Sequence, residues 1–78
     1  MMQHGTLHRQ TYLRHYGHDI PEAQFKIGQE VVFFDGKEFR KDTVVAMCMT
    51  DKSNFLIEYL LDKHEDLLWD YQVWEKDL

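Results

Sequence analysis

Aromatic side chains are the residues of this sequence best suited to hold a ligand. Four of them lie in its C-terminal part, each beside an acidic residue: Tyr59, Trp69, Tyr71 and Trp74. Together with Phe33 or Phe34 they could surround a quaternary ammonium group by cation–π attraction, worth about 0.5–2 kcal/mol per ring. The alternative is that the rings fill the core or a subunit interface, because a small chain needs aromatic residues for burial. We predict that the four residues bind a ligand or partner.

A second group consists of histidines near the N-terminus: His4, His8, His15 and His18. On one continuous helix their side chains would project within about 80° of one another. A stripe of imidazoles is a ligand set for transition metals. However, Gly5 and Gly17 interrupt such a helix, and no cysteine lies near the histidines. The sequence therefore predicts a solvated N-terminal arm, with no metal and no cofactor.

No motif in the sequence indicates catalysis. The only serine, Ser53, falls in a predicted turn, and the only cysteine, Cys48, lies inside the apolar run Val44–Met49. A thiol in such a run is typically buried and inert rather than an activated thiolate. The four glycines are isolated from one another, so the pattern of a phosphate-binding loop is absent. We therefore predict a protein that is not an enzyme and has no catalytic residues.

The charge of the chain limits its partners. Fourteen acidic and nine basic residues give a net charge of −5, which argues against direct nucleic-acid binding because that function needs clustered Lys and Arg. The acidic residues of the C-terminal half form either a solvated face or a nucleic-acid mimic. Six of them could occupy the nucleic-acid-binding groove of another protein: Asp62, Glu65, Asp66, Asp70, Glu75 and Asp77.

The sequence favours a cytoplasmic protein without membrane contacts. Its longest unbroken apolar run, Val44–Met49, has six residues, far fewer than the ~20 that span a bilayer. The N-terminal residues lack the apolar run of a signal peptide. A single cysteine can form no intrachain disulfide, and a lone thiol suits a reducing compartment.

Residues 1–24 are predicted to form an N-terminal arm or short helix. Thr6 is a suitable N-cap for a helix that ends at Tyr16, with Gly17 at the C′ position in the left-handed conformation. Three apolar side chains of this helix lie within about 100° of one another: Tyr12, Leu13 and Tyr16. We expect this face to dock on the core.

Residues 25–78 change to the two-residue period of strands. Strands are predicted at 30–34, 43–49 and 55–61, and from 67, followed by a helical turn and a last short strand. Asp35-Gly36 predicts a hairpin with a type I′ turn. The fold class is therefore mainly β, as a small five-stranded antiparallel barrel that closes to avoid open edges.

Two short patterns carry a resemblance to a known fold. The segment Phe25-Lys26-Ile27-Gly28-Gln29-Glu30-Val31 contains an Ile-Gly-x-x-Val opening, and the chain closes on an acidic residue followed by Leu78. In these features residues 25–78 resemble SH3-like barrels of the Tudor and KOW type. The resemblance implies an SH3-like barrel, and members of that fold mostly bind peptides, modified lysines or RNA.

The same opening, Phe25-x-Ile27-Gly28, is similar to that of the plasmid type II dihydrofolate reductases. These enzymes are short SH3-like chains that assemble into a tetramer around a central pore. They line the pore with a Val-Gln-Ile-Tyr segment, whereas the nearest segment here, Tyr71-Gln72-Val73-Trp74, has a different order. No catalytic residue is therefore carried over from this family.

The predicted core takes one face of each strand: Val31, Phe33, Val45, Met47, Phe55, Ile57, Tyr59, Leu61, Trp69 and Val73. In the second strand Val44, Ala46 and Cys48 would serve equally well. A strand that is apolar on both faces, in so small a chain, needs a partner to cover its second face. We therefore expect a homo-oligomer, most simply a dimer with twofold symmetry.

Three functions remain open from the sequence. The first is a small non-enzymatic binding or adaptor module, which contacts a protein or peptide through an aromatic barrel end or an oligomeric groove. The second is an acidic inhibitor of a nucleic-acid-handling protein, of the phage or accessory-gene type. The third is a pore-type oligomeric enzyme that resembles type II dihydrofolate reductase.

Overall fold

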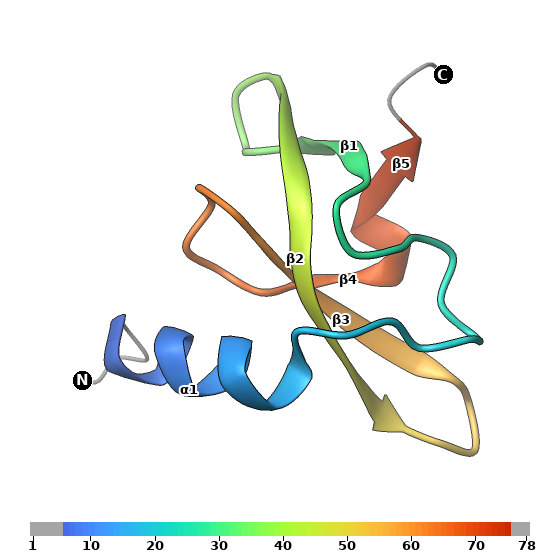
Figure 1. Cartoon of the computed structure of the whole chain (residues 1–78). Coiled ribbons are helices and arrows are strands. Elements are labelled where there is room, and N and C mark those ends of the chain that lie inside the picture. The colour runs from blue at the N-terminus through green and yellow to red at the C-terminus, as the bar shows by residue number, and fades with distance from the viewer. Residues whose placement is uncertain (1–5, 76–78) are drawn as a thin grey trace.

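The fold is mainly β, with one short helix before five antiparallel strands. The computed structural model describes residues 6–75. Its elements follow one another along the chain: α1 (Thr6–Tyr16), β1 (Glu30–Phe34), β2 (Phe39–Asp51), β3 (Leu56–Leu61), β4 (Leu68–Trp69), the 3-10 turn η1 (Asp70–Gln72) and β5 (Val73–Glu75). Figure 1 shows α1 lying beside the sheet. The predicted helix and strands are confirmed, and β2 is longer than predicted at both ends.

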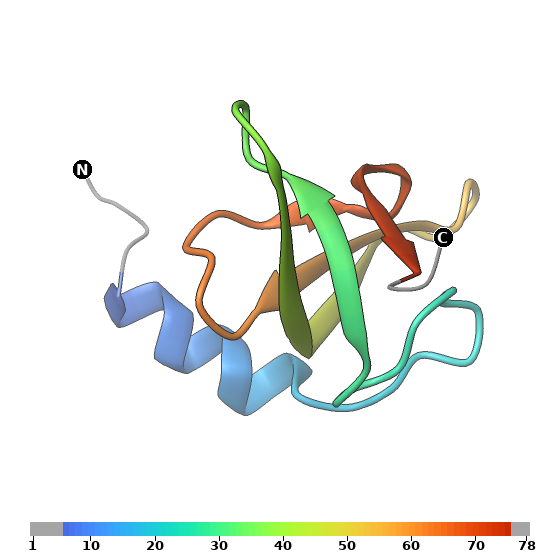
Figure 2. The same cartoon turned by 90° about the horizontal axis from the view of Figure 1, so that it is seen from above.

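One sheet with the strand order β4-β3-β2-β1-β5 joins all five strands. The long strand β2 pairs with β1 through residues 39–43 and with β3 through residues 44–51, so it belongs to both halves of a strongly twisted sheet (Figure 2). The edge strands β4 and β5 have only two and three residues, and no pairing joins them within the described chain. The predicted closed barrel is therefore corrected to an open, barrel-like sheet, because the strands that would close it are the shortest.

A β-bulge in β2 decides which of its side chains enter the core. Between Val44 and Ala46 the register with β3 shifts, so that Val45 is an extra residue. An extra residue moves the alternation of a strand by one position. Val44 and Met47 consequently both lie in the core cluster, whereas Ala46 is buried outside it. The prediction of Val45 as a core residue is therefore wrong, since its side chain is only half-buried.

The core lies between the two halves of the sheet: Phe25, Val31, Phe33, Val44, Met47, Ile57, Tyr59, Leu61, Leu68 and Val73. The predicted core residue Phe55 is wrong, because it sits in the turn before β3 with a φ of 51° and its side chain is 61% exposed. Trp69 is half-buried, since its neighbour Leu68 takes the inward position of β4. Phe25, in the segment before β1, belongs to the core without having been predicted there.

Helix α1 covers the outer face of β2 and β3, where the sequence suggested a partner subunit. Ala46 and Leu60 pair across the two strands and are 0% and 2% exposed, although neither belongs to the core cluster. Two residues along β3, on the same face, Glu58 accepts a hydrogen bond from the Tyr12 hydroxyl at 3.0 Å. The chain's own helix therefore supplies this cover, and the dimer stays a prediction.

Two turns that contain glycine differ from their predicted forms. Gly17 does not have a positive φ; instead, a Cβ at this position would lie 2.6 Å from the Leu13 carbonyl oxygen. Gly36 does have a φ of 101°, but four residues rather than two separate β1 from β2. The predicted type I′ turn is wrong because the Asp35 carboxylate accepts hydrogen bonds from two backbone N–H groups beyond Gly36, at 2.8 and 2.9 Å, which shapes a longer turn.

Candidate functional site

Three aromatic side chains are exposed together on the outer face of β1, β2 and β5, and we call them the aromatic cluster: Phe34, Phe39 and Trp74. Phe34 and Phe39 pair across the β1–β2 hairpin. The ring centroids of Phe34 and Phe39 are 5.2 Å apart, and those of Phe39 and Trp74 are 5.8 Å apart. The three side chains are 49%, 64% and 39% exposed, in that order. The cluster is therefore a continuous apolar surface.

The alternation of β1 explains why these rings face outward. Phe33 is 2% exposed and lies in the core, so its neighbour Phe34 points to the opposite face of the sheet. Trp74 and Lys41 both pair with Val32 and share that outer face. The cluster thus has a lysine beside it on β2.

A groove opens between the β1–β2 hairpin and the loop that joins β3 to β4, and we call it the hairpin groove. Its volume is about 530 Å³, within the ~300–1,000 Å³ of typical ligand sites. Eight residues line it: Phe33, Glu38, Phe39, Arg40, Lys41, Asp42, Lys63 and His64. Phe39 belongs to both the aromatic cluster and the hairpin groove, so the two surfaces are continuous.

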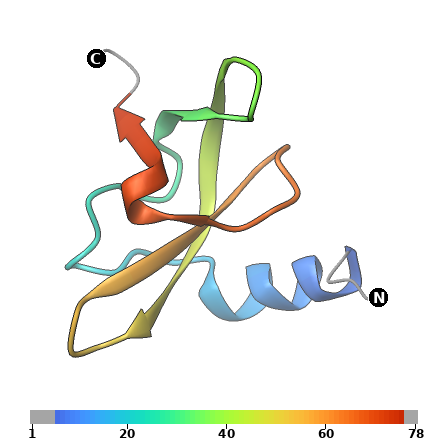
Figure 3. The same ribbon diagram turned by 180° about the vertical axis from the view of Figure 1, so that it is seen from behind.

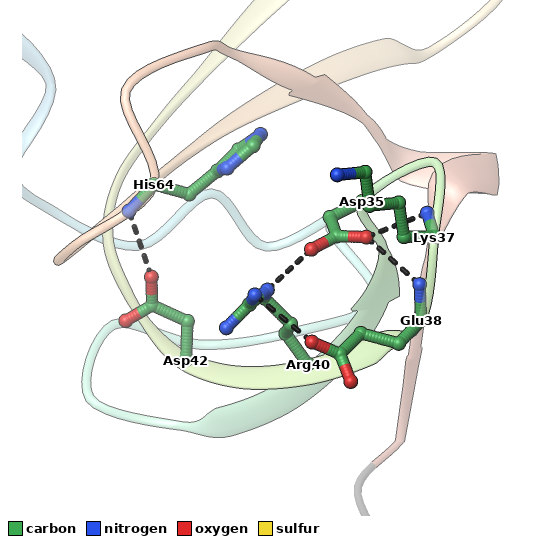
Figure 4. A network of polar contacts seen from close by, with 6 residues as sticks. All are labelled: Asp35, Lys37, Glu38, Arg40, Asp42 and His64. Atoms are coloured by element: carbon green, nitrogen blue, oxygen red, sulfur yellow. Dashed lines mark hydrogen bonds and ion pairs between the residues drawn. The ribbon is translucent and has the colours of Figure 1, made fainter.

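Asp42 fixes one wall of the hairpin groove. This side chain is buried, at 7% exposed. Its Oδ1 accepts a hydrogen bond from the Thr43 N–H at 2.8 Å. Its Oδ2 accepts hydrogen bonds from the N–H groups of Lys63 and His64, both at 2.9 Å, and Figure 4 shows the bond to His64. A carboxylate with these three donors is stable when buried and holds the β3–β4 loop against β2.

Arg9 of α1 holds the same loop from its other side. The guanidinium donates hydrogen bonds to the carbonyl oxygens of Leu61 at 2.7 Å and His64 at 3.3 Å, and also to that of Asp62. Carbonyl oxygens that converge on one cation resist rearrangement of the backbone. Asp42 therefore binds two backbone N–H groups of the loop, and Arg9 binds backbone carbonyl oxygens at and next to the same residues.

Arg40 bridges two acidic residues of the hairpin. Its Nε donates to Asp35, and its Nη2 lies 2.9 Å from Glu38 Oε2. The Arg40 hydrogen bond, together with the backbone N–H groups of Glu38 and Lys37, lowers the pKa of Asp35 to about 2. Figure 4 shows these contacts around the hairpin turn. The two acids thus share one internal cation.

The four predicted site residues are distributed over three environments. Tyr59 lies in the core, where its hydroxyl donates to Asp70 Oδ1 at 2.6 Å, and burial together with Asp70 raises its pKa. Trp69 is half-buried on β4, whereas Tyr71 on η1 is 69% exposed. Only Trp74 belongs to the aromatic cluster, and no two of the four rings are in contact.

Sequence reasoning named Phe33 and Phe34 as alternatives, but it missed Phe39 and the polar residues of the hairpin groove. Phe39 follows the turn, and it can be predicted as a site residue only if the register of the hairpin is known. In that register Phe39 lies opposite Phe34 and shares its outer face, whereas Phe33 faces the core. The double Phe before Asp35-Gly36 is the signal that could have found it. No local pattern predicts that Lys63 and His64 lie near the hairpin. Their position depends on hydrogen bonds to Asp42, which is 21 and 22 residues away in the sequence.

Tyr12, Glu58 and Cys48 form a polar group between α1 and the sheet. Burial, followed by the neighbouring Glu58 carboxylate, raises the pKa of the Tyr12 hydroxyl and of the Cys48 thiol. A thiol with a raised pKa is protonated at neutral pH and is a poor nucleophile. These groups therefore attach the helix to the sheet rather than activate Cys48.

The predicted histidine stripe is described only in part. His4 lies outside the described residues, while His15 and His18 are exposed at and beyond the end of α1. Within residues 6–75, no group of three His, Cys, Asp or Glu side chains is arranged to hold a metal ion.

The acidic residues considered as a nucleic-acid mimic lie on several elements. Three are exposed in the loop between β3 and β4: Asp62, Glu65 and Asp66. Asp70 accepts a hydrogen bond from the core residue Tyr59, and Glu75 is exposed on β5. Asp77 lies outside the described residues. The inhibitor function stays a prediction.

Comparisons with known proteins give this chain no family. No protein-family model matches it, and no curated protein and no solved structure is significantly similar to it. In the described part of the chain, no helix is long and apolar enough to cross a membrane. The aromatic cluster and the hairpin groove are therefore the basis for a functional proposal.

Proposed function

We propose that this protein is a small non-enzymatic binding module that holds a peptide segment of a partner protein across the aromatic cluster and the hairpin groove. One observation carries the proposal: Phe34, Phe39 and Trp74 contact one another and yet are 49%, 64% and 39% exposed. Contiguous exposed apolar surface typically marks an interaction site, and aromatic residues are common anchors of such sites.

Charge indicates the chemistry of the peptide. Lys41 stands beside the aromatic cluster, and Lys63 lines the adjoining groove. Complementary charge favours a partner with acidic residues and speeds its association. We therefore propose a peptide with one aromatic or large aliphatic side chain for the cluster and acidic groups next to it.

The small five-stranded antiparallel sheet is compatible with the resemblance to SH3-like barrels. Members of that fold mostly bind other molecules, so the resemblance supports a binding role over a catalytic one. The two surfaces named above lie at one end of this sheet, around the β1–β2 hairpin.

The test begins with phage-displayed random peptides selected on the full-length protein. Selected peptides should combine an aromatic or leucine anchor with Asp or Glu. Their affinity, measured by fluorescence polarisation, should fall at least about tenfold in Phe39→Ser, as for an interface anchor. Folding of each variant is checked by its NMR spectrum.

Phe55→Ser is the matched control for this experiment. Phe55 is 61% exposed, close to the 64% of Phe39, but its turn lies at the opposite end of β2 from the hairpin (Figures 1 and 3). Its substitution should leave the affinity unchanged. Equal losses in both variants would contradict the proposal, as would a loss in Tyr71→Ser alone, which would favour the sequence-predicted residues instead.

A second copy of the chain could also occupy the aromatic cluster, and the experiment must distinguish it from a peptide. Light scattering should return the same mass for the wild-type protein and for Phe39→Ser at the concentrations used for binding, because the predicted dimer would form through another face. A dimer that Phe39→Ser dissociates would assign the aromatic cluster to a second copy of the chain and would contradict peptide binding there.

A further inference from the structure

We infer that the hairpin groove is an anion subsite, which takes a carboxylate or phosphoryl group carried by the bound peptide. This inference rests on the proposed function for the source of the anion. Binding of an anion to the groove itself follows from the residues that line it.

Basic residues gather at this groove although the chain as a whole is acidic. Arg40, Lys41 and Lys63 line the groove, and Figure 4 shows Lys37 in the adjoining hairpin turn. These are four of the nine Lys and Arg residues in a chain with a net charge of −5. Three basic and two acidic residues line the groove, so its lining has a small positive charge in an acidic chain, which favours an anion.

The two acidic residues that line the groove, Asp42 and Glu38, and the adjoining Asp35 already have partners, whereas the acidic residues of the β3–β4 loop are exposed outside the lining. Asp42 accepts three backbone hydrogen bonds, and Asp35 and Glu38 both pair with Arg40. Neither Lys41 nor Lys63 forms an ion pair with any residue between 6 and 75. Two ammonium groups thus remain available to an incoming anion.

His64 adds polar ring atoms to the same space. Its imidazole lies against Phe33, with ring centroids 4.5 Å apart, and its ring nitrogens have no hydrogen-bond partner among the described residues. Arg40 uses Nε and Nη2 for its acidic partners and retains Nη1. Figure 4 shows the imidazole and the guanidinium extending toward the same open space. Such donors suit anionic oxygen atoms.

The backbone that carries two of these groups is held in place before any ligand arrives. Asp42 binds the amides of Lys63 and His64, and Arg9 binds the carbonyl of His64. Groups that are already ordered lose less conformational entropy on binding. The groove adjoins Phe39, so an acidic group next to an aromatic anchor in a peptide would reach it.

Inorganic phosphate is the first probe, followed by three peptides that share one aromatic anchor and differ at a neighbouring position. That position carries glutamate, phosphoserine or neutral glutamine. We expect phosphate alone to shift the backbone NMR signals of Arg40, Lys63 and His64. The two anionic peptides should bind more tightly than the glutamine peptide, with a difference that decreases as salt is added.

The double variant Lys41→Gln and Lys63→Gln should weaken the binding of phosphate and of the anionic peptides about fivefold or more. The double variant Lys26→Gln and Lys52→Gln is the matched control, because it removes the same charge at exposed positions outside the groove. It should leave binding within about twofold of the wild-type value. Binding of the glutamine peptide should change little in either variant.

Equal weakening in the two double variants would overturn the inference, because the effect would then follow net charge alone. Absence of phosphate-induced shifts at the groove would also overturn it. Tighter binding of the phosphoserine or of the glutamate peptide identifies the source of the anion. Shifts by phosphate together with a peptide affinity that Phe39→Ser does not change would support the subsite and contradict the proposed function.

Discussion

The two halves of the outer face of β2 differ in how much another segment of the chain covers them. Where β2 pairs with β3, α1 lies over Ala46 and Leu60 and leaves them 0% and 2% exposed. Where β2 pairs with β1, Phe39 remains 64% exposed beside Phe34 and Trp74. Both halves contain apolar side chains, and only the half that pairs with β3 is covered by another segment of the described chain.

This difference separates stability from binding. Apolar surface under the helix contributes to the free energy of unfolding, because it is removed from water in the folded state. Apolar surface at the hairpin is still in water and gains burial only when a partner arrives. Substitutions in the two halves should therefore have different consequences.

The largest effect on stability is expected under the helix. Leu60→Ala should lower the free energy of unfolding by about 2–4 kcal/mol, because it leaves a cavity between α1 and the sheet. Phe39→Ser should change it by no more than about 0.5 kcal/mol, as for exposed positions. Urea denaturation of both variants measures the difference, and equal losses would contradict the distinction between the two halves.

Asp42 should rank next, because it links the exposed half to the β3–β4 loop. Asp42→Ala removes the acceptor of three backbone N–H groups and should cost about 2–3 kcal/mol in the free energy of unfolding. Hydrogen exchange at Lys63 and His64 should become faster. Asp66→Ala, an exposed residue of the same loop, is the control. Exchange that stays slow in Asp42→Ala would show that another contact holds the loop.

Arg9 connects the covered half to the groove, and its loss should have a smaller effect. Arg9→Gln should lower the free energy of unfolding by about 1–2 kcal/mol, because loop carbonyl oxygens lose their charged donor. It should also shift the NMR signals of Lys63 and His64. Arg14→Gln, at an exposed position of α1, should do neither. If both variants behave alike, α1 has no role in the shape of the groove.

The smallest effect concerns the hairpin turn at low pH. The pKa of Asp35 is lowered to about 2, against about 3.9 in an unfolded chain. The contribution of the carboxylate is therefore fully present above the unfolded value and is lost as the pH falls toward 2. NMR titration of the Asp35 carboxyl should show this low value, and Arg40→Gln should raise it. An ordinary value in the wild-type protein would mean that the Arg40 contact is absent in solution.

Local patterns sufficed for the elements and for much of the core. Glu30–Phe34 was predicted as a strand from its β-branched and aromatic composition, and Ile57 and Tyr59 were predicted to face the core from a period of two. These properties depend on neighbours within a few residues. Val45 failed as a core residue because a single bulge, which no local pattern reveals, reverses the alternation of β2.

The site could be predicted only in part. Trp74, which the sequence predicts as a binding residue, belongs to the aromatic cluster, whereas Tyr59 is buried because it faces the core from β3. Phe39 requires the exact cross-strand register, and the hairpin groove requires a contact between Asp42 and Lys63, which are 21 residues apart. Neither is a property of a short segment.

By itself, the sequence determined a mainly β chain with a short N-terminal helix, because backbone preference and apolar period act over a few residues. Tertiary structure decided which apolar face α1 would cover and which basic residues would meet at the hairpin. The physical reason is that burial and charge complementarity are established between segments distant in sequence, and the long strand β2 brings those segments together.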